Sequence, residues 1–228
     1  MIQKANEAYN AGDYETAYEL YTQLAQQDNA DAQTSLAYMY QMAQGCEKDE
    51  AKTLELYTKA AEAKQPYALF NLGILYENGV GGVEHDMFRA HELHMEAATR
   101  GVPPAMYEVA LMLERGLGCM QNFSEAAFWY EEAAKRGNLQ AFNNLGALYK
   151  EGHGVIQDDA KCFICFDRAA NGGLAEGLYN LGLLYDQGIG CEIDNDKALD
   201  LCRKAAYKGH EKAKEIIKGL QENGKIVF

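Results

Sequence analysis

The side chains in this sequence that are best able to bind metals or take part in catalysis are its six cysteines and five histidines. Cys162 and Cys165 form a C-x-x-C pair, a spacing found in redox motifs and in half of a zinc site. A structural zinc site needs a second pair at a matching distance, and none follows. His91 and His94 are three residues apart, which places both on one face of a helix, but no third ligand lies nearby. We therefore expect no metal site and no bound cofactor.

Motifs for nucleophilic catalysis and for phosphate binding are also incomplete. The chain has only two serines, Ser35 and Ser124, and neither begins an S-x-x-K motif or belongs to a Ser-His-Asp arrangement. Turns of the G-x-G type, such as Gly152-His153-Gly154, end a helical pattern instead of following a strand and opening a helix, as phosphate loops do. Carboxylates are numerous but scattered. The sequence predicts no catalytic residue and no enzymatic activity.

A repeat of 36 or 37 residues determines how these residues must be positioned. Each copy holds a small residue, then a Leu-Gly or similar pair, then a glycine turn, then an alanine pair. The small residue stands at Ala32, Ala68, Ala105, Ala141 and Gly177. A fixed period of this length is the signature of a helical solenoid, in which stacked units share one continuous core.

In repeat register, the reactive side chains align with apolar core positions. Cys162 and Cys165 align with Ala126 and Trp129, and His94 aligns with a core aromatic position. Cysteine fills small apolar sites well. We therefore expect these cysteines to be free thiols and His94 to be a packed side chain.

The predicted fold class is all-α: a right-handed α/α solenoid of about five repeats, forming a single domain over residues 1–228. Prolines at the starts of helices and glycines at their ends support the predicted boundaries. Asp86, Asp159 and either Asp194 or Asp196 are expected to cap the second helices. The expected units are an N-terminal hairpin over 2–27, repeats over 30–64, 66–101, 103–137, 139–173 and 175–209, and a C-terminal capping helix over 210–222.

The pattern A-x-x-x-L-G-x-x-Y-x-x-G-x-G-V, followed by an acidic loop and an alanine pair, resembles the Sel-one-like repeat (SLR). This family is related to the tetratricopeptide repeat (TPR), and the segment YNAGDYETAYELYTQLA resembles a TPR hairpin. The resemblance implies an adaptor, a pathway regulator or a host-interaction factor. Cysteine-rich relatives carry a cysteine at the second alanine of each pair, whereas this chain has alanine there, for example at Ala170.

Charge limits the partners of the chain. The formal net charge is −13, and the first 50 residues hold nine acidic and two basic side chains. A nucleic-acid partner is not expected, because phosphate binding needs a basic surface. No stretch approaches the apolar length of a membrane helix, and no signal peptide is evident, so a cytoplasmic location is the simplest expectation. A signal removed before this numbering would make the protein periplasmic or secreted. The oligomeric state stays open.

A partner is expected in the concave groove lined by the first helix of each repeat. By analogy with TPR grooves, the positions around the Leu-Gly pair point into it. Asparagine can donate to and accept from an extended peptide, and aromatic rings supply contact area. Alternatively, the asparagines tie adjacent helices together and the aromatics pack between repeats. The expected groove residues are Tyr38, Phe70, Asn71, Ile74, Tyr107, Glu108, Leu111, Asn143, Asn144, Tyr179, Asn180 and Leu183.

Three functional hypotheses follow. The first is a non-enzymatic adaptor or scaffold that binds a peptide or protein, with a basic partner as one option, in this groove. The second is an immunity or inhibitor protein that neutralises a toxin, since an acidic surface suits a basic partner. The third is a hydrolase of the β-lactamase-like type described for cysteine-rich relatives, which the missing S-x-x-K motif disfavours.

Overall fold

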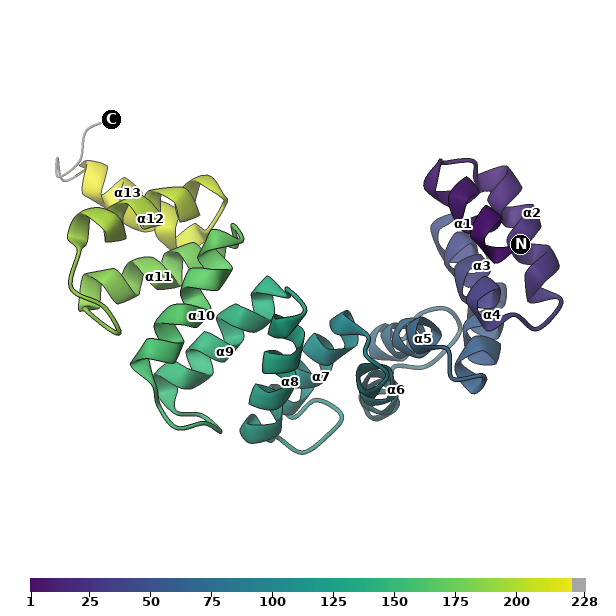
Figure 1. Cartoon of the computed structure of the whole chain (residues 1–228), viewed down its shortest axis with the longest axis horizontal. Coiled ribbons are helices and arrows are strands. Elements are labelled where there is room, and N and C mark those ends of the chain that lie inside the picture. The colour runs from purple at the N-terminus through teal and green to yellow at the C-terminus, as the bar shows by residue number, and fades with distance from the viewer. Residues whose placement is uncertain (223–228) are drawn as a thin grey trace. The chain divides into compact units, whose positions relative to one another are not determined.

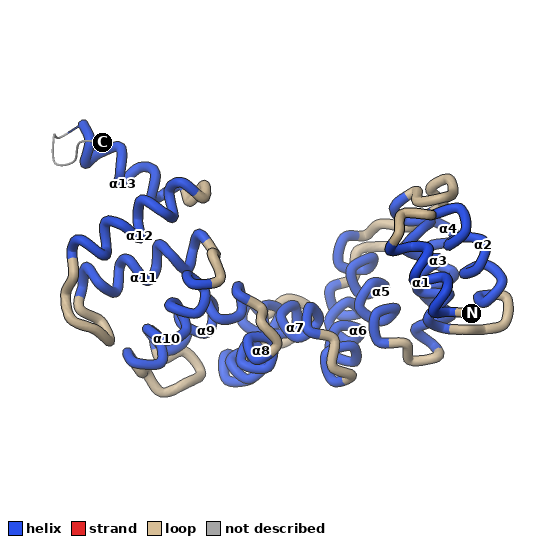
Figure 2. The backbone as a smooth tube through the Cα atoms, turned by 45° about the horizontal axis from the view of Figure 1, so that its top comes forward, coloured by secondary structure: helices blue, strands red, loops and turns tan. Residues whose placement is uncertain are grey.

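A computed structural model describes residues 1–222, and this part of the chain consists of thirteen α-helices without strands (Figures 1 and 2). Residues 223–228, the last of the expected domain, lie outside the described residues. The first seven helices are α1 (Ile2–Asn10), α2 (Tyr14–Ala25), α3 (Ala30–Met42), α4 (Glu50–Glu62), α5 (Pro66–Asn78), α6 (Met87–Thr99) and α7 (Pro103–Arg115). The others are α8 (Phe123–Lys135), α9 (Leu139–Glu151), α10 (Asp159–Asn171), α11 (Ala175–Gln187), α12 (Asn195–Tyr207) and α13 (Glu211–Glu222).

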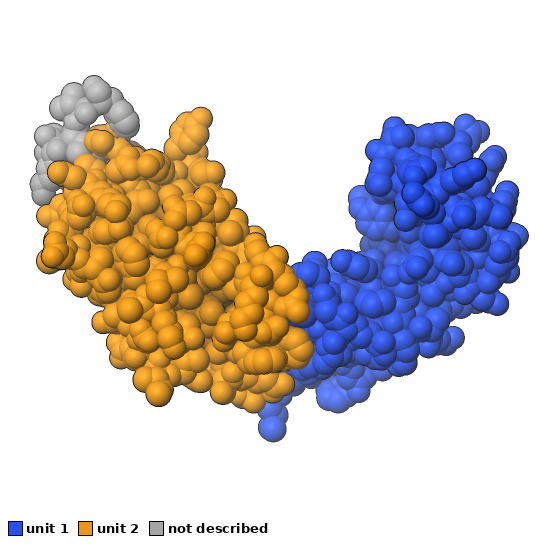
Figure 3. All heavy atoms as spheres, in the orientation of Figure 1, with its two compact units in different colours: residues 1–121 blue, residues 122–228 orange. Residues whose placement is uncertain are grey.

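The chain divides into two compact units, residues 1–121 and residues 122–228 (Figure 3). In unit 1 every helix from α1 to α7 packs on its neighbours in sequence, and the same holds from α8 to α13 in unit 2. The expected all-α solenoid of paired helices is therefore confirmed. The division falls between the two helices of the third expected repeat, and the single domain over 1–228 stays a prediction.

The expected roles of proline and glycine at the helix ends agree with the structure. Pro66 and Pro103 occupy the first positions of α5 and α7, where a missing N–H costs no hydrogen bond. Gly116 ends α7 in the left-handed conformation at φ 69°, which a residue with a side chain adopts less readily. One expected cap is wrong: Asp158, and not Asp159, caps α10, because its side-chain oxygen accepts from Lys161 N at 2.9 Å. Asp194, not Asp196, caps α12.

Small residues in the first helix of a repeat allow the second helix to approach closely. A Cβ added to Gly73 of α5 would lie 2.7 Å from His94 Cε1 of α6. At the same repeat position, a Cβ on Gly146 would lie 2.9 Å from Phe166 Cε1. His94 is fully buried at the aromatic position that the register predicts. The glycines therefore contribute through packing, which offsets their low helix propensity.

Each unit has an apolar core between its helices. In unit 1 Ala5, Tyr21, Leu36 and Met39 belong to one cluster of α1, α2 and α3. In unit 2 the cluster contains residues of α10 to α13, with Cys162 among them. Burial raises the pKa of the Cys162 thiol to about 11 and that of Cys165 to about 12, so both stay protonated at neutral pH.

All six cysteines are free thiols in the structure. The three in the glycine turns are half-buried, and two of them, Cys119 and Cys191, donate to carbonyl oxygens of the preceding helix, each at 3.6 Å. Thiols with this packing behave as small apolar residues.

Over residues 1–222, every helix falls short of the combination of length and apolar character that crossing a bilayer requires.

Candidate functional site

The twelve predicted groove residues all retain contact with solvent. Tyr38 is 39% exposed and the other eleven are half-buried. They lie on the first helices of the repeats: α3, α5 and α7 in unit 1, and α9 and α11 in unit 2. We call this surface the A-helix face and describe it separately for each unit.

In unit 1, three of these residues line one pocket of about 450 Å³ between α1, α2, α3 and α5. They are Tyr38, Phe70 and Asn71. Ile74, one turn beyond Phe70, is half-buried and does not line this pocket. We call this the tyrosine pocket, and its complete lining is Tyr9, Tyr21, Thr34, Ser35, Tyr38, Tyr67, Phe70 and Asn71.

Three aromatic residues of the tyrosine pocket were absent from the sequence prediction. Tyr67 lies one turn before Asn71 on α5, so helical spacing could have indicated it. Tyr21, 36 residues before Tyr57, holds the core aromatic position of the repeat, whereas Tyr9 lies on the short first helix of the leading hairpin. The place of Tyr9 beside this pocket depends on how α1 packs, which the repeat pattern does not specify.

On α7, Glu108 lies in an acidic environment. Burial and the nearby Glu77 carboxylate raise the pKa of Glu108, against the opposing charges of His94 and Arg115. Glu77 in turn lies with Oε2 3.4 Å from His94 Nε2, and this contact lowers the pKa of Glu77. Among the described residues, no basic side chain forms an ion pair with Glu108. A cation from outside the chain would lower this pKa again, because it would stabilise the charged form of Glu108. Its α7 neighbours Tyr107 and Leu111 are also half-buried.

In unit 2, the predicted asparagines hydrogen-bond to protein side chains. Asn180 of α11 donates to Asn143 Oδ1 of α9 at 2.8 Å, which joins two adjacent first helices. Asn144 donates to the Tyr130 hydroxyl at 3.0 Å. These bonds fit the alternative in which the asparagines tie helices together, although each amide keeps further capacity for a ligand.

The aromatic residue of α11 also has a partner within unit 2. Tyr179 stacks on His210 with ring centroids 4.3 Å apart. Together with Leu183, Tyr179 lines a second pocket of about 320 Å³, which is completed by residues of α12 and α13 such as Leu199 and Ile216. The A-helix face of unit 2 therefore offers an apolar pocket next to a row of hydrogen-bonded amides.

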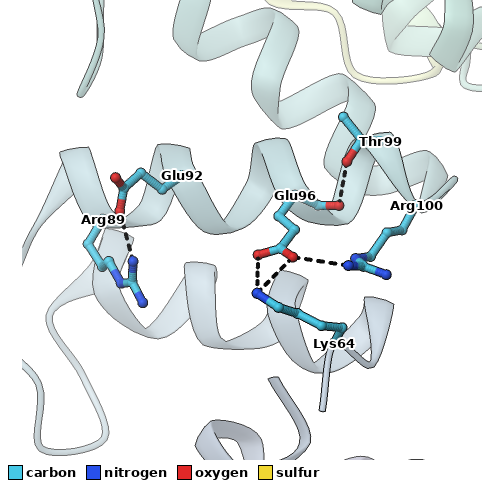
Figure 4. A network of polar contacts seen from close by, with 6 residues as sticks. All are labelled: Lys64, Arg89, Glu92, Glu96, Thr99 and Arg100. Carbon is cyan, nitrogen blue, oxygen red and sulfur yellow. Dashed lines mark hydrogen bonds and ion pairs between the residues drawn. The ribbon is translucent and has the colours of Figure 1, made fainter. Parts of the chain in front are cut away.

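A larger depression of about 650 Å³ lies between α4, α5 and α6, and none of the predicted groove residues lines it. Lys64 and Arg89, which line it, both pair with carboxylates (Figure 4). Glu96 accepts from Lys64 at 3.0 Å and from Arg100 at 3.2 Å, and Arg89 pairs with Glu92 at 2.8 Å. Since these cations are neutralised internally, the depression has no evident preference for an anion.

No metal-binding arrangement is found in the described part of the chain. Groups of three or more His, Cys, Asp or Glu side chains with suitable geometry are absent over residues 1–222. Cys162 and Cys165 lie inside the core, as described above. The tyrosine pocket contains three of the predicted groove residues and the second pocket contains two, and what both offer is binding surface.

Comparisons with known proteins agree with the repeat. The Sel1 repeat model matches residues 10–29, 30–64, 66–102, 103–138, 140–174 and 175–210. The matched boundaries lie within one residue of those of the five expected repeats, and the shorter first match falls in the leading hairpin, which resembles a TPR hairpin. No significant match to a curated protein is found.

Solved structures resemble the chain over most of its length. A Sel1 repeat protein from Oxalobacter formigenes is 30% identical with a TM-score of 0.90, over 97% of this chain and 88% of that one. The protective antigen c5321 of uropathogenic Escherichia coli is 26% identical with a TM-score of 0.57, over 91% of this chain and 52% of that one. The immunity protein PA5088 of Pseudomonas aeruginosa is 26% identical with a TM-score of 0.50, over 79% and 67%. With six matched segments across residues 10–210, this chain belongs to the Sel1 repeat family.

Proposed function

We propose that this chain is a non-enzymatic adaptor that binds a protein partner along its A-helix face. The Sel1 repeat fold supports a protein-interaction role. The observation that carries the proposal is the tyrosine pocket, where aromatic side chains from four helices converge and those of α1, α3 and α5 remain partly open to solvent. Tyrosine and other aromatic side chains are enriched among the residues that dominate binding energy in protein interfaces.

The hydrogen bonds that the unit 2 asparagines make to neighbouring helices are compatible with this proposal. Asn143, Asn144 and Asn180 can hold adjacent helices in place while neighbouring side chains contact the partner. We propose that all twelve predicted residues belong to the partner-binding groove, with those of unit 1 making the largest contribution. The acidic composition of unit 1 favours a partner with a basic surface.

The test compares two double variants of the full chain. Tyr38→Ala with Phe70→Ala removes two aromatic rings from the tyrosine pocket. The control, Phe88→Ala with Phe128→Ala, removes two rings from the second helices α6 and α8, where they are 65% and 55% exposed. The probe is the protein that co-purifies with the tagged wild-type chain. We expect at least an approximately tenfold loss of affinity for the first variant only. Equal affinity for both variants and wild type contradicts the assignment.

A second candidate is an immunity protein that neutralises a toxin. It is supported by the likeness to the immunity protein PA5088 and by the acidic charge of this chain. Its test is genetic: a neighbouring gene is expressed alone and then together with this chain. Toxicity that this chain relieves, and that the Tyr38→Ala, Phe70→Ala variant relieves less well, supports the immunity role. A harmless neighbour, or toxicity that this chain leaves unchanged, excludes that gene product as the partner.

A further inference from the structure

Five aromatic rings, from α1, α2, α3 and α5, line the tyrosine pocket. Tyr38 and Tyr67 are 39% and 51% exposed, whereas Tyr21 is 3% exposed. The face of such a ring carries the negative part of its π system, so it attracts a cation that comes to lie over it.

Two of the four tyrosine hydroxyls of this pocket are already committed as donors. Tyr9 Oη donates to Gln44 Oε1 and Tyr21 Oη donates to Asn6 Oδ1, each at 2.7 Å. A phenol has one proton, so once that proton is donated, the oxygen can only accept. Burial raises the pKa of Tyr9 and Tyr21, which keeps both hydroxyls neutral. At these two oxygens the pocket therefore favours a ligand that donates hydrogen bonds.

The charges on the surrounding helices also favour a ligand that is a cation. The four helices that form the pocket carry five acidic side chains and one basic side chain, Lys4. No Lys, Arg or His lines the pocket itself. A cation is therefore attracted to this part of unit 1, and an anion is repelled.

We propose that the tyrosine pocket binds an arginine side chain of the protein partner. The guanidinium group is planar, always charged and carries five N–H donors, so it can stack on the aromatic rings and donate to the phenol oxygens. A lysine ammonium shares the charge but lacks the planar surface. This inference rests on the proposed binding function and adds to it the chemistry of one anchoring residue.

The test uses three short peptides that differ only at the central residue: acetyl-Gly-Arg-Gly-amide and its citrulline and norleucine counterparts. Citrulline has nearly the shape of arginine without the charge, and norleucine retains only the apolar chain. Each is titrated into the full chain, labelled with ¹⁵N, and binding is followed from backbone amide shifts. We expect the arginine peptide to shift the amides of Ser35 and Asn71 and to bind at least about fivefold tighter than citrulline. Raising the salt concentration should weaken that binding.

Variants locate the effect. Tyr38→Leu and Tyr67→Leu replace partly exposed rings and should abolish the preference for arginine. Tyr207→Leu is the control, because Tyr207 is 94% exposed on α12 and lies far from the pocket in sequence. Equal binding of the arginine and citrulline peptides overturns the proposal, as does tighter binding of norleucine or a response that Tyr38→Leu leaves unchanged.

Failure of the arginine proposal can be distinguished from failure of the proposed function. If the Tyr38→Ala, Phe70→Ala variant keeps its partner, the A-helix face of unit 1 is not the binding surface, and both proposals fail. If that variant loses its partner while the peptides show no preference for arginine, the groove stands and only the arginine assignment fails.

Discussion

At the scale of single residues, the structure distinguishes reactive side chains that pack in the core from a carboxylate whose position destabilises the folded state. Cys162, Cys165 and His94 have reactive side chains, yet all three occupy core positions that repeat register predicts. Glu108 is different, because a half-buried carboxylate beside Glu77 is unfavourable for folding when it is ionised. Such a residue on a predicted binding face is a candidate for function.

The raised pKa of Glu108 predicts how the stability of the protein changes with pH. The folded-state pKa of Glu108 is raised above the unfolded value of about 4.3. The stability linked to its protonation is therefore fully present below that value and is lost as pH rises through the folded pKa. Glu108→Gln should raise the urea midpoint at pH 7 and leave it nearly unchanged at pH 4.

Glu77→Gln is the matched control, and it should change the stability at pH 7 in the opposite direction. The His94 contact lowers the pKa of Glu77, so the stabilisation is present at neutral pH and is lost as pH falls through the folded pKa. This variant should lower the urea midpoint at pH 7. If both substitutions shift the midpoint in the same direction, the electrostatic interpretation is wrong.

The close contact between Gly73 and His94 predicts a second stability effect. Gly73→Ala gains up to about 1 kcal/mol of helix propensity, but the new methyl group meets the imidazole at 2.7 Å. Overpacking of this kind typically costs about 1–3 kcal/mol. We expect a net decrease in the free energy of unfolding. Gly219→Ala on α13 should increase it instead, since a Cβ there meets no atom within 4 Å; urea titrations of both variants provide the comparison.

At the scale of helices, most of the fold could be predicted from the sequence. Glycine turns and alanine pairs recur with the repeat, and Pro66 and Pro103 mark the starts of two first helices. The error at Asp158 and Asp159 has a physical cause: two adjacent aspartates both suit a cap, and only the backbone geometry decides which one accepts the N–H. The tyrosine pocket was predicted only in part, because Tyr9 reaches it through tertiary packing of the leading hairpin.

The corrected cap is itself testable. Asp158→Ala removes the acceptor for Lys161 N and should destabilise the protein by about 1 kcal/mol. Asp159→Ala, in the first turn of α10, should cost less, because it loses only a favourable interaction with the helix dipole. Thermal or urea unfolding distinguishes the two, and a larger loss for Asp159→Ala contradicts the cap.

At the scale of the whole molecule, we propose that the two units unfold together in one cooperative transition. Trp129 is the single tryptophan and lies in α8, so its fluorescence reports on unit 2, whereas far-UV circular dichroism reports on every helix. The two signals should give the same urea midpoint if the single domain is correct. A loss of helix that clearly precedes the fluorescence change contradicts it.

The central claim is that a protein partner contacts the A-helix face of unit 1. Its most direct test is site-specific photo-crosslinking in cells, with benzoylphenylalanine placed at Tyr38 or at Phe88. Both side chains are exposed on unit 1, Tyr38 in the tyrosine pocket and Phe88 on α6. The proposal predicts a discrete crosslinked product from position 38 and none from position 88. A product from position 88 alone would contradict it.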